Sequence, residues 1–129
     1  MTDLPAASPL RALGRGLKLA FAVAVVTVLV LSLLPGRDLP SVGLSDKLEH
    51  IIAYAGLALS GSLAFSRPTA VLWLAVLLPA LGIALEFCQM LVPGRSAEVA
   101  DAVADTIGVA VVIVPLLILH RVRRGGGRP

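Results

Sequence analysis

Residues 69–91 read TAVLWLAVLLPALGIALEFCQML, an apolar stretch of membrane-spanning length that ends in polar residues. A helix needs about 20 mostly apolar residues to cross a bilayer, and three other stretches fit this requirement. They are residues 17–34, residues 51–65 and residues 99–119, of which the second reaches spanning length only if its helix starts near Asp46. The sequence therefore predicts an all-α, polytopic integral membrane protein, a four-transmembrane-helix bundle with up-down-up-down topology.

The composition supports a membrane protein. Of the 129 residues, 57% are hydrophobic and 15% are charged, and the mean hydropathy is +0.94. These values exclude an ordinary soluble domain. The stretch 17–34 is longer than the apolar core of a signal peptide, and no A-x-A-like cleavage site follows it. We interpret it as a retained span, with a cleaved signal peptide as the alternative. The single cysteine excludes an intrachain disulfide.

Basic residues indicate the orientation. Four spans place both termini on one side, and eight of the eleven basic residues fall on that side. The positive-inside rule then predicts a multi-pass protein of the bacterial cytoplasmic (inner) membrane with both termini cytoplasmic. The net charge of +3 comes from this asymmetry, so we expect no nucleic-acid partner. The expected regions are a cytoplasmic N-terminal tail at 1–14, a membrane domain at 15–120 and a basic cytoplasmic tail at 121–129.

Acidic residues gather on the opposite, outer side. Seven of the eight lie there: Asp38, Asp46, Glu49, Glu86, Glu98, Asp101 and Asp105. Helical spacing gives three of the predicted helices a polar face. These faces consist of Asp46, His50 and Tyr54 in the second helix, Glu86 and Gln89 in the third, and Glu98, Asp101, Asp105 and Gly108 in the fourth. Ionisable groups at membrane depth are costly, so the three faces should meet as a site. Ser96 is the expected N-cap of the last helix.

These polar segments resemble a known family. Residues 46–54 (DKLEHIIAY) look like the D-K-x-x-H-x-x-x-[YF] opening of VanZ-like membrane proteins, and residues 86–96 (EFCQMLVPGRS) resemble its E-x-x-Q-x-x-x-P-G-R-S block. Asp101, Asp105 and Gly108 match its D-x-x-x-N/D-x-x-G continuation, with Asp105 where Asn is commoner. The resemblance covers roughly residues 20–118. It implies an envelope protein of the kind associated with resistance to teicoplanin, a glycopeptide antibiotic that acts outside the membrane.

The favoured function is that of a non-enzymatic factor binding a lipid-linked or wall-associated ligand on the outer face. The residues expected to bind this ligand, or to form a polar network, are Asp46, Lys47, His50, Glu86, Gln89, Arg95, Asp101 and Asp105. The alternative is a small membrane enzyme in which His50, with Asp46 or Glu86, acts as acid and base on a lipid-linked substrate. No serine or cysteine is convincingly placed as a nucleophile. A transporter is disfavoured because the deep charges all lie in the outer half.

Two further interpretations of the cluster stay open. The same residues can form a buried network of hydrogen bonds and ion pairs that holds the helices together. Alternatively, His50 with several carboxylates suits a divalent cation such as Zn²⁺ or Mn²⁺. The spacing contains no paired histidines, so the sequence assigns no metal site and no cofactor. Arg95 is expected to pair with Glu98 or Asp101, or to bind a phosphate headgroup. The expected partners are the bilayer, a lipid-linked cell-wall precursor and, from small-residue spacing, a second copy of the chain.

Overall fold

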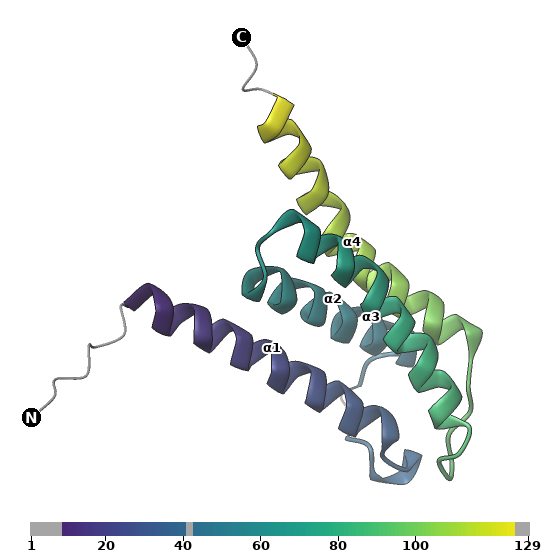
Figure 1. Cartoon of the computed structure of the whole chain (residues 1–129). Coiled ribbons are helices and arrows are strands. Elements are labelled where there is room, and N and C mark those ends of the chain that lie inside the picture. The colour runs from purple at the N-terminus through teal and green to yellow at the C-terminus, as the bar shows by residue number, and fades with distance from the viewer. Residues whose placement is uncertain (1–8, 41–42, 126–129) are drawn as a thin grey trace, which may run out of the picture.

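The computed structural model describes residues 9–40 and 43–125, and this part of the chain is all helical (Figure 1). The elements are α1 (Pro9–Leu33), the short 3-10 helix η1 (Gly36–Asp38), α2 (Asp46–Ala64), α3 (Pro68–Gln89) and α4 (Val99–Gly125). The all-α prediction is thereby confirmed for the described residues. Helices α1 and α4 extend beyond the predicted limits of the membrane domain at residues 15 and 120.

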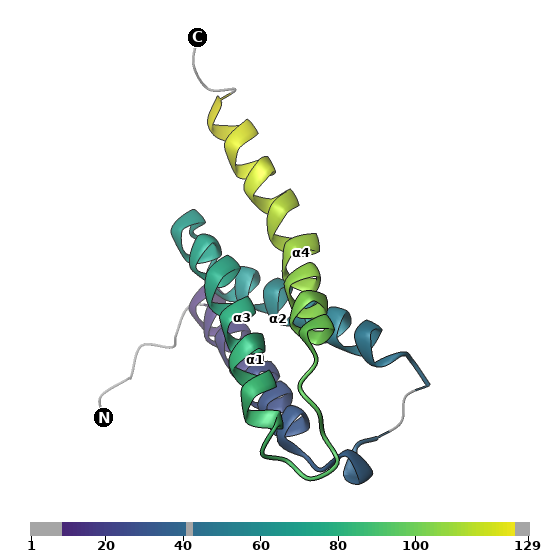
Figure 2. The ribbon, with the colours of Figure 1, turned by 90° about the vertical axis from the view of Figure 1, so that its right-hand side faces the viewer.

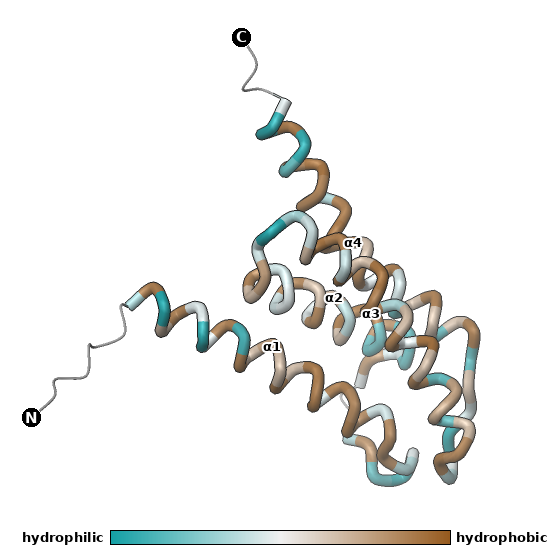
Figure 3. Tube along the Cα trace, in the orientation of Figure 1, coloured by the Kyte–Doolittle hydropathy of each residue, from teal (hydrophilic) through white to brown (hydrophobic). Residues whose placement is uncertain are grey.

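Three of the helices are long and apolar enough to cross a membrane: α1, α3 and α4. Helix α2 does not reach the same apolar length, because its 19 residues begin with Asp46, Lys47 and Glu49 and also contain glycines and serines. Figure 3 shows the apolar middle parts of the helices, with hydrophilic residues at the start of α1 and the end of α4. By length and composition, three helices of the chain therefore have the character of membrane spans.

Helix α2 lies at the centre of the packing and contacts each of the other three helices. Its inward face contributes Leu57 and Ala58, which are 1% and 0% exposed, and the core continues through Val71 of α3 and Ile113 of α4. Large apolar side chains on the outward faces of α1, α3 and α4 stay exposed, for example Trp73 at 62%. Exposed apolar faces of this extent are expected where lipid surrounds a protein.

Two glycines allow α4 to approach its neighbours closely. A β-carbon at Gly108 would lie 2.4 Å from the Ile51 carbonyl oxygen of α2, so only a glycine permits this backbone contact. A β-carbon at Gly82 of α3 would lie 2.4 Å from Asp105 Oδ2. These contacts hold the acidic first turns of α4 against both α2 and α3.

The connections after α1 and α3 meet at one end of the molecule, which we call the acidic end (Figures 1 and 2). A β-carbon at Gly36 would lie 2.6 Å from the Gly94 carbonyl oxygen, so the two connections touch there. The carbonyl oxygen of Ser32, near the end of α1, accepts hydrogen bonds from Gln89 Nε2 at 3.1 Å and from Arg95 at 3.4 Å. The end of α1 is thereby tied to the end of α3.

The prediction that Ser96 is the N-cap of the last helix is wrong. Helix α4 begins at Val99, three residues after Ser96. The backbone N–H of Glu98, just before the helix, donates a hydrogen bond to Glu86 Oε2 at 2.9 Å, and the Glu98 carbonyl accepts one from the Asp101 N–H. A carboxylate of α3 therefore supplies the acceptor that Ser96 was expected to provide.

Candidate functional site

The structure brings the predicted polar faces of α2, α3 and α4 together at the acidic end. Helix α2 contributes Asp46, Lys47 and His50; α3 contributes Glu86 and Gln89; α4 contributes Asp101 and Asp105; Arg95 lies in the connection before α4. Four of these side chains are buried although they are polar or charged: Glu86, Gln89, Asp101 and Asp105, between 1% and 6% exposed. Their inward direction agrees with the expectation that such groups avoid lipid.

The deepest contact of the cluster joins His50 to Asp105. The Nδ1 atom of His50 lies 2.8 Å from Asp105 Oδ1. Asp105 is 1% exposed, and its carboxylate is seated where Gly82 has no side chain. With the proton on Nδ1, the ring donates to the carboxylate and its second nitrogen, Nε2, is left free as an acceptor or ligand. The Asp at position 105 thus supplies a carboxylate partner that fixes the orientation of the imidazole.

Lys47 is surrounded by three carboxylates. Its ammonium nitrogen lies 2.8 Å from Asp101 Oδ1 and 3.4 Å from Asp46 Oδ2, and it also donates a hydrogen bond to Glu98 Oε2. Asp101 is almost fully buried, whereas Asp46 and Glu98 are half exposed. The ion pair with Asp101 is therefore the least screened by water of the three. Lys47 joins the start of α2 to the start of α4 and offsets part of the negative charge.

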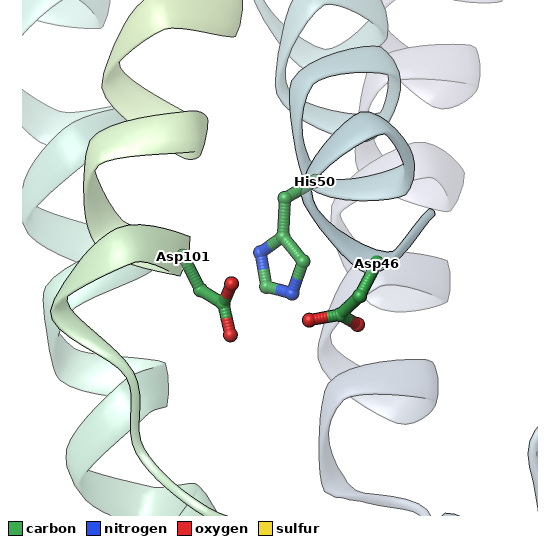
Figure 4. A group of neighbouring side chains, drawn as sticks. All are labelled: Asp46, His50 and Asp101. Carbon is green, nitrogen blue, oxygen red and sulfur yellow. The ribbon is translucent and has the colours of Figure 1, made fainter. Parts of the chain in front are cut away.

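Asp46 and Asp101 lie on two sides of the His50 imidazole (Figure 4). Potential ligand atoms of these three residues all lie within 4.8 Å of one another, and the same holds for His50, Glu86 and Asp105. His50 is therefore shared between an outer group with Asp46 and Asp101 and an inner group with Glu86 and Asp105. An imidazole among carboxylates can transfer protons, bind a cation or bind a ligand with hydrogen-bond donors.

Two adjoining cavities open at this cluster. The smaller, of about 190 Å³, is lined mostly by polar groups, among them Asp46, His50, Arg95, Glu98 and Asp101. The larger, of about 300 Å³, is mainly apolar and extends between α1, the following connection and α2. Asp46, His50 and Arg95 line both cavities. The site therefore combines an apolar compartment with a charged compartment across a common border.

The sequence model of the VanZ/LLP1 family matches residues 10–120, which include all four helices except the first residue of α1 and the last five residues of α4. The chain belongs to this family. The resemblance seen in the motifs at residues 46–54 and 86–96 is thereby confirmed. No curated protein and no solved structure matches the chain.

In this VanZ/LLP1 protein, the contacts of Arg95 differ from the expected ones. Among the described residues it forms no ion pair with Glu98 or Asp101 and donates instead to the Ser32 carbonyl. The side-chain amide of the buried Gln89 also donates a hydrogen bond to this carbonyl oxygen. Arg95 therefore retains other guanidinium N–H groups at the border of both cavities, where an anionic group of a ligand would meet them.

Two of the acidic residues predicted to lie on the outer side take no part in the cluster. Asp38 is exposed in η1 and pairs with Arg37 at 3.7 Å. Glu49 lines the apolar cavity and does not reach the polar one. The sequence predicted only that both residues lie on the same side of the membrane as the cluster, and such a prediction does not determine where on that side they lie.

Three features of the site were not predicted from the sequence. The role of Gly82 had a usable signal, since it lies four residues before Glu86 and therefore on the same helical face. The contacts of the Ser32 carbonyl and of the Glu98 N–H had no such signal. Backbone groups of a connection carry no residue-type pattern, so only the three-dimensional arrangement reveals their partners.

Proposed function

We propose that this VanZ/LLP1 membrane protein binds a lipid-linked cell-wall precursor at the outer surface of the bacterial cytoplasmic membrane. The observation that carries this proposal is the pair of adjoining cavities, one apolar and one charged, with Asp46, His50 and Arg95 at their border. A lipid-linked precursor has the same two parts, since a polar headgroup is joined to a hydrocarbon chain. The apolar cavity would hold the first part of the chain, and the charged cavity the headgroup.

The orientation belongs to the same proposal. Basic residues lie in the first turns of α1, in the α2–α3 turn and in the last turns of α4, so the positive-inside rule predicts that these parts face the cytoplasm. In this arrangement α2 is a fourth crossing helix, whose polar first turn is shielded by α3 and α4 at the outer surface. The acidic end then faces the compartment in which lipid-linked wall precursors are exposed.

Binding is tested directly with purified protein in detergent and with undecaprenyl phosphate or lipid II as the probe. Ala53 lines the apolar cavity, and a phenylalanine there would fill it. We expect Ala53→Phe to weaken binding at least tenfold. The matched control is Ala110→Phe, on an exposed face of α4 outside both cavities. Absence of binding by the natural protein, or equal binding by both variants, would contradict the proposal.

Glycopeptide resistance would follow if the bound precursor were shielded from teicoplanin. The test compares teicoplanin susceptibility in cells that express the natural chain, Asp46→Ala or Asp38→Ala. Asp46 borders both cavities and is half exposed, so its removal should leave the fold intact. We expect Asp46→Ala to abolish any resistance at equal protein level and Asp38→Ala to retain it. Equal resistance in all three strains would show that the site does not cause the resistance.

The second candidate function is catalysis, which the pairing of His50 Nδ1 with Asp105 Oδ1 at 2.8 Å favours. A buried carboxylate that orients an imidazole is the arrangement of many general bases. In this case His50→Gln would retain binding of lipid II but lose its turnover. For the binding protein that we favour, no turnover of lipid II is expected from the natural chain.

A further inference from the structure

We propose that His50 Nε2 and the carboxylates of Asp46 and Asp101 form a binding site for one divalent cation of the zinc or manganese class. The ligand atoms of these residues lie within 4.8 Å of one another, close enough for one ion to contact all three. They come from two helices, and Figure 4 shows the imidazole between the two carboxylates. One imidazole with two carboxylates suits Zn²⁺ or Mn²⁺ better than the all-oxygen preference of Mg²⁺ or Ca²⁺.

Asp105 completes the arrangement without contacting the ion. Metal-binding histidines usually donate their second ring N–H to a carboxylate, which fixes the tautomer and the direction of the ring. The contact of His50 Nδ1 with Asp105 Oδ1 at 2.8 Å has this form. Asp105 is itself held by burial and by the space at Gly82. The ring is therefore oriented before any ion binds, and Asp105 is a positioning residue.

A buried hydroxyl beside the cluster lacks a hydrogen-bond partner. It belongs to Tyr54, which is 2% exposed, lies one helical turn after His50 and has no partner for its hydroxyl among the described residues. Tyr54 lines the larger cavity together with Asp46 and His50. Asp101 Oδ1, in contrast, is paired with the Lys47 ammonium at 2.8 Å. Buried groups are rarely left unpaired, and a water molecule on a bound ion would give the Tyr54 hydroxyl a partner.

Lys47 occupies the position that a cation would take. Its nitrogen lies 2.8 Å from Asp101 Oδ1 and 3.4 Å from Asp46 Oδ2, the two carboxylates of the proposed site. An ammonium and a metal ion compete for the same oxygens. Lys47 is then an internal competitor, and its long exposed side chain can move aside. The removal of its charge should therefore strengthen metal binding, a result opposite to the one expected if the cluster only holds the helices together.

Three protein ligands leave coordination positions open toward the polar cavity. Gln89, Arg95 and Ser96 line the same cavity. An ion with open positions can bind a phosphate oxygen and thereby bring an anionic headgroup to a site that is otherwise acidic. This last role rests on the proposed function, whereas the metal site itself rests only on the geometry of α2 and α4.

The experiment uses the full chain in detergent, without an affinity tag, and titrates Zn²⁺ or Mn²⁺ alone in a calorimeter. We expect one ion per chain for the natural protein and tighter binding for Lys47→Met. Asp101→Asn and His50→Ala should lose binding, and Asp105→Asn should weaken it about 10- to 100-fold. Asp38→Asn, an exposed outer carboxylate outside the cluster, is the matched control and should bind as the natural chain does.

A spectroscopic measurement keeps the test independent of folding defects. Co²⁺ added to Lys47→Met protein should give visible absorption bands that disappear in the double variant Lys47→Met/His50→Gln. The proposal is overturned if neither the natural chain nor Lys47→Met binds Zn²⁺ or Mn²⁺, or if binding persists unchanged without His50. Because no lipid is present in these titrations, failure of lipid binding and failure of metal binding are separate results.

Discussion

The carboxylate of Asp105 occupies the space that a side chain at Gly82 would take: a β-carbon there would lie 2.4 Å from Oδ2 and 3.1 Å from the Asp105 β-carbon. Helix α3 thereby presses Asp105 of α4 toward His50 of α2, and three helices meet at one carboxylate. Asp105 is only 1% exposed and is held in place by this packing. Its contact with His50 therefore also determines where the imidazole points.

The substitution Gly82→Ala should displace this carboxylate. Overpacking of a tight contact costs about 1–3 kcal/mol, and we expect the free energy of unfolding to fall by this amount. Unfolding by SDS titration in mixed micelles measures the change. The matched control is Gly56→Ala on α2, where an added β-carbon meets nothing within 4 Å. Equal stability of the two variants would show that Asp105 moves aside without cost.

Glu86 should be required for the start of α4. The substitution Glu86→Ala removes the acceptor of the Glu98 N–H, so we expect a loss of about 1–3 kcal/mol in the free energy of unfolding. Glu86→Gln keeps an acceptor oxygen and should lose clearly less. Hydrogen exchange of the amide at Glu98 provides a local readout, with faster exchange expected only in Glu86→Ala. Equal exchange in both variants would rule out this hydrogen bond as the anchor.

Gln89 should hold the end of α1. Its side chain is 2% exposed and donates to the Ser32 carbonyl at 3.1 Å, so Gln89→Leu leaves that carbonyl with only the longer contact from Arg95. We expect a loss of about 1 kcal/mol in SDS titration. The neighbouring Met90→Leu, at an exposed position, should change little. A spin-label distance between α1 and α3 that does not broaden in Gln89→Leu would argue against this tie.

The crossing of the membrane by α2 can be tested with single cysteines in a Cys88→Ser background. Asp38→Cys lies in η1 before α2, and Ser66→Cys lies in the turn after it, both exposed. If α2 crosses, a membrane-impermeant maleimide should label Asp38→Cys in intact cells and Ser66→Cys only after the cytoplasmic membrane is permeabilised. Labelling of both in intact cells, or of neither, would place the ends of α2 on the same side.

The polar faces could be predicted because they depend on helical spacing alone. Asp46 and His50 are one turn apart, as are Asp101 and Asp105, and burial of charge required these faces to meet. The start of α4 could not be predicted in this way. Ser96 has the side chain of an N-cap, but Glu86, twelve residues before Glu98, accepts the hydrogen bond of the Glu98 N–H, and the helix begins at Val99.

The contacts of Lys47 could not be predicted in this way either. Lys47 was included in the expected polar network, but the sequence did not identify its partners. In the structure its flexible side chain reaches across to Asp101 in the first turn of α4 and to Glu98 in the connection just before it. Long side chains are poorly constrained by helical position, so their partners follow from the assembled helices rather than from the pattern.

The reach of Lys47 across to α4 has a consequence for biogenesis. During synthesis α2 emerges before α4, so the ammonium of Lys47 is already available when the buried acid Asp101 arrives. The newly made protein can therefore neutralise this buried acid with a residue of its own chain while its helices assemble.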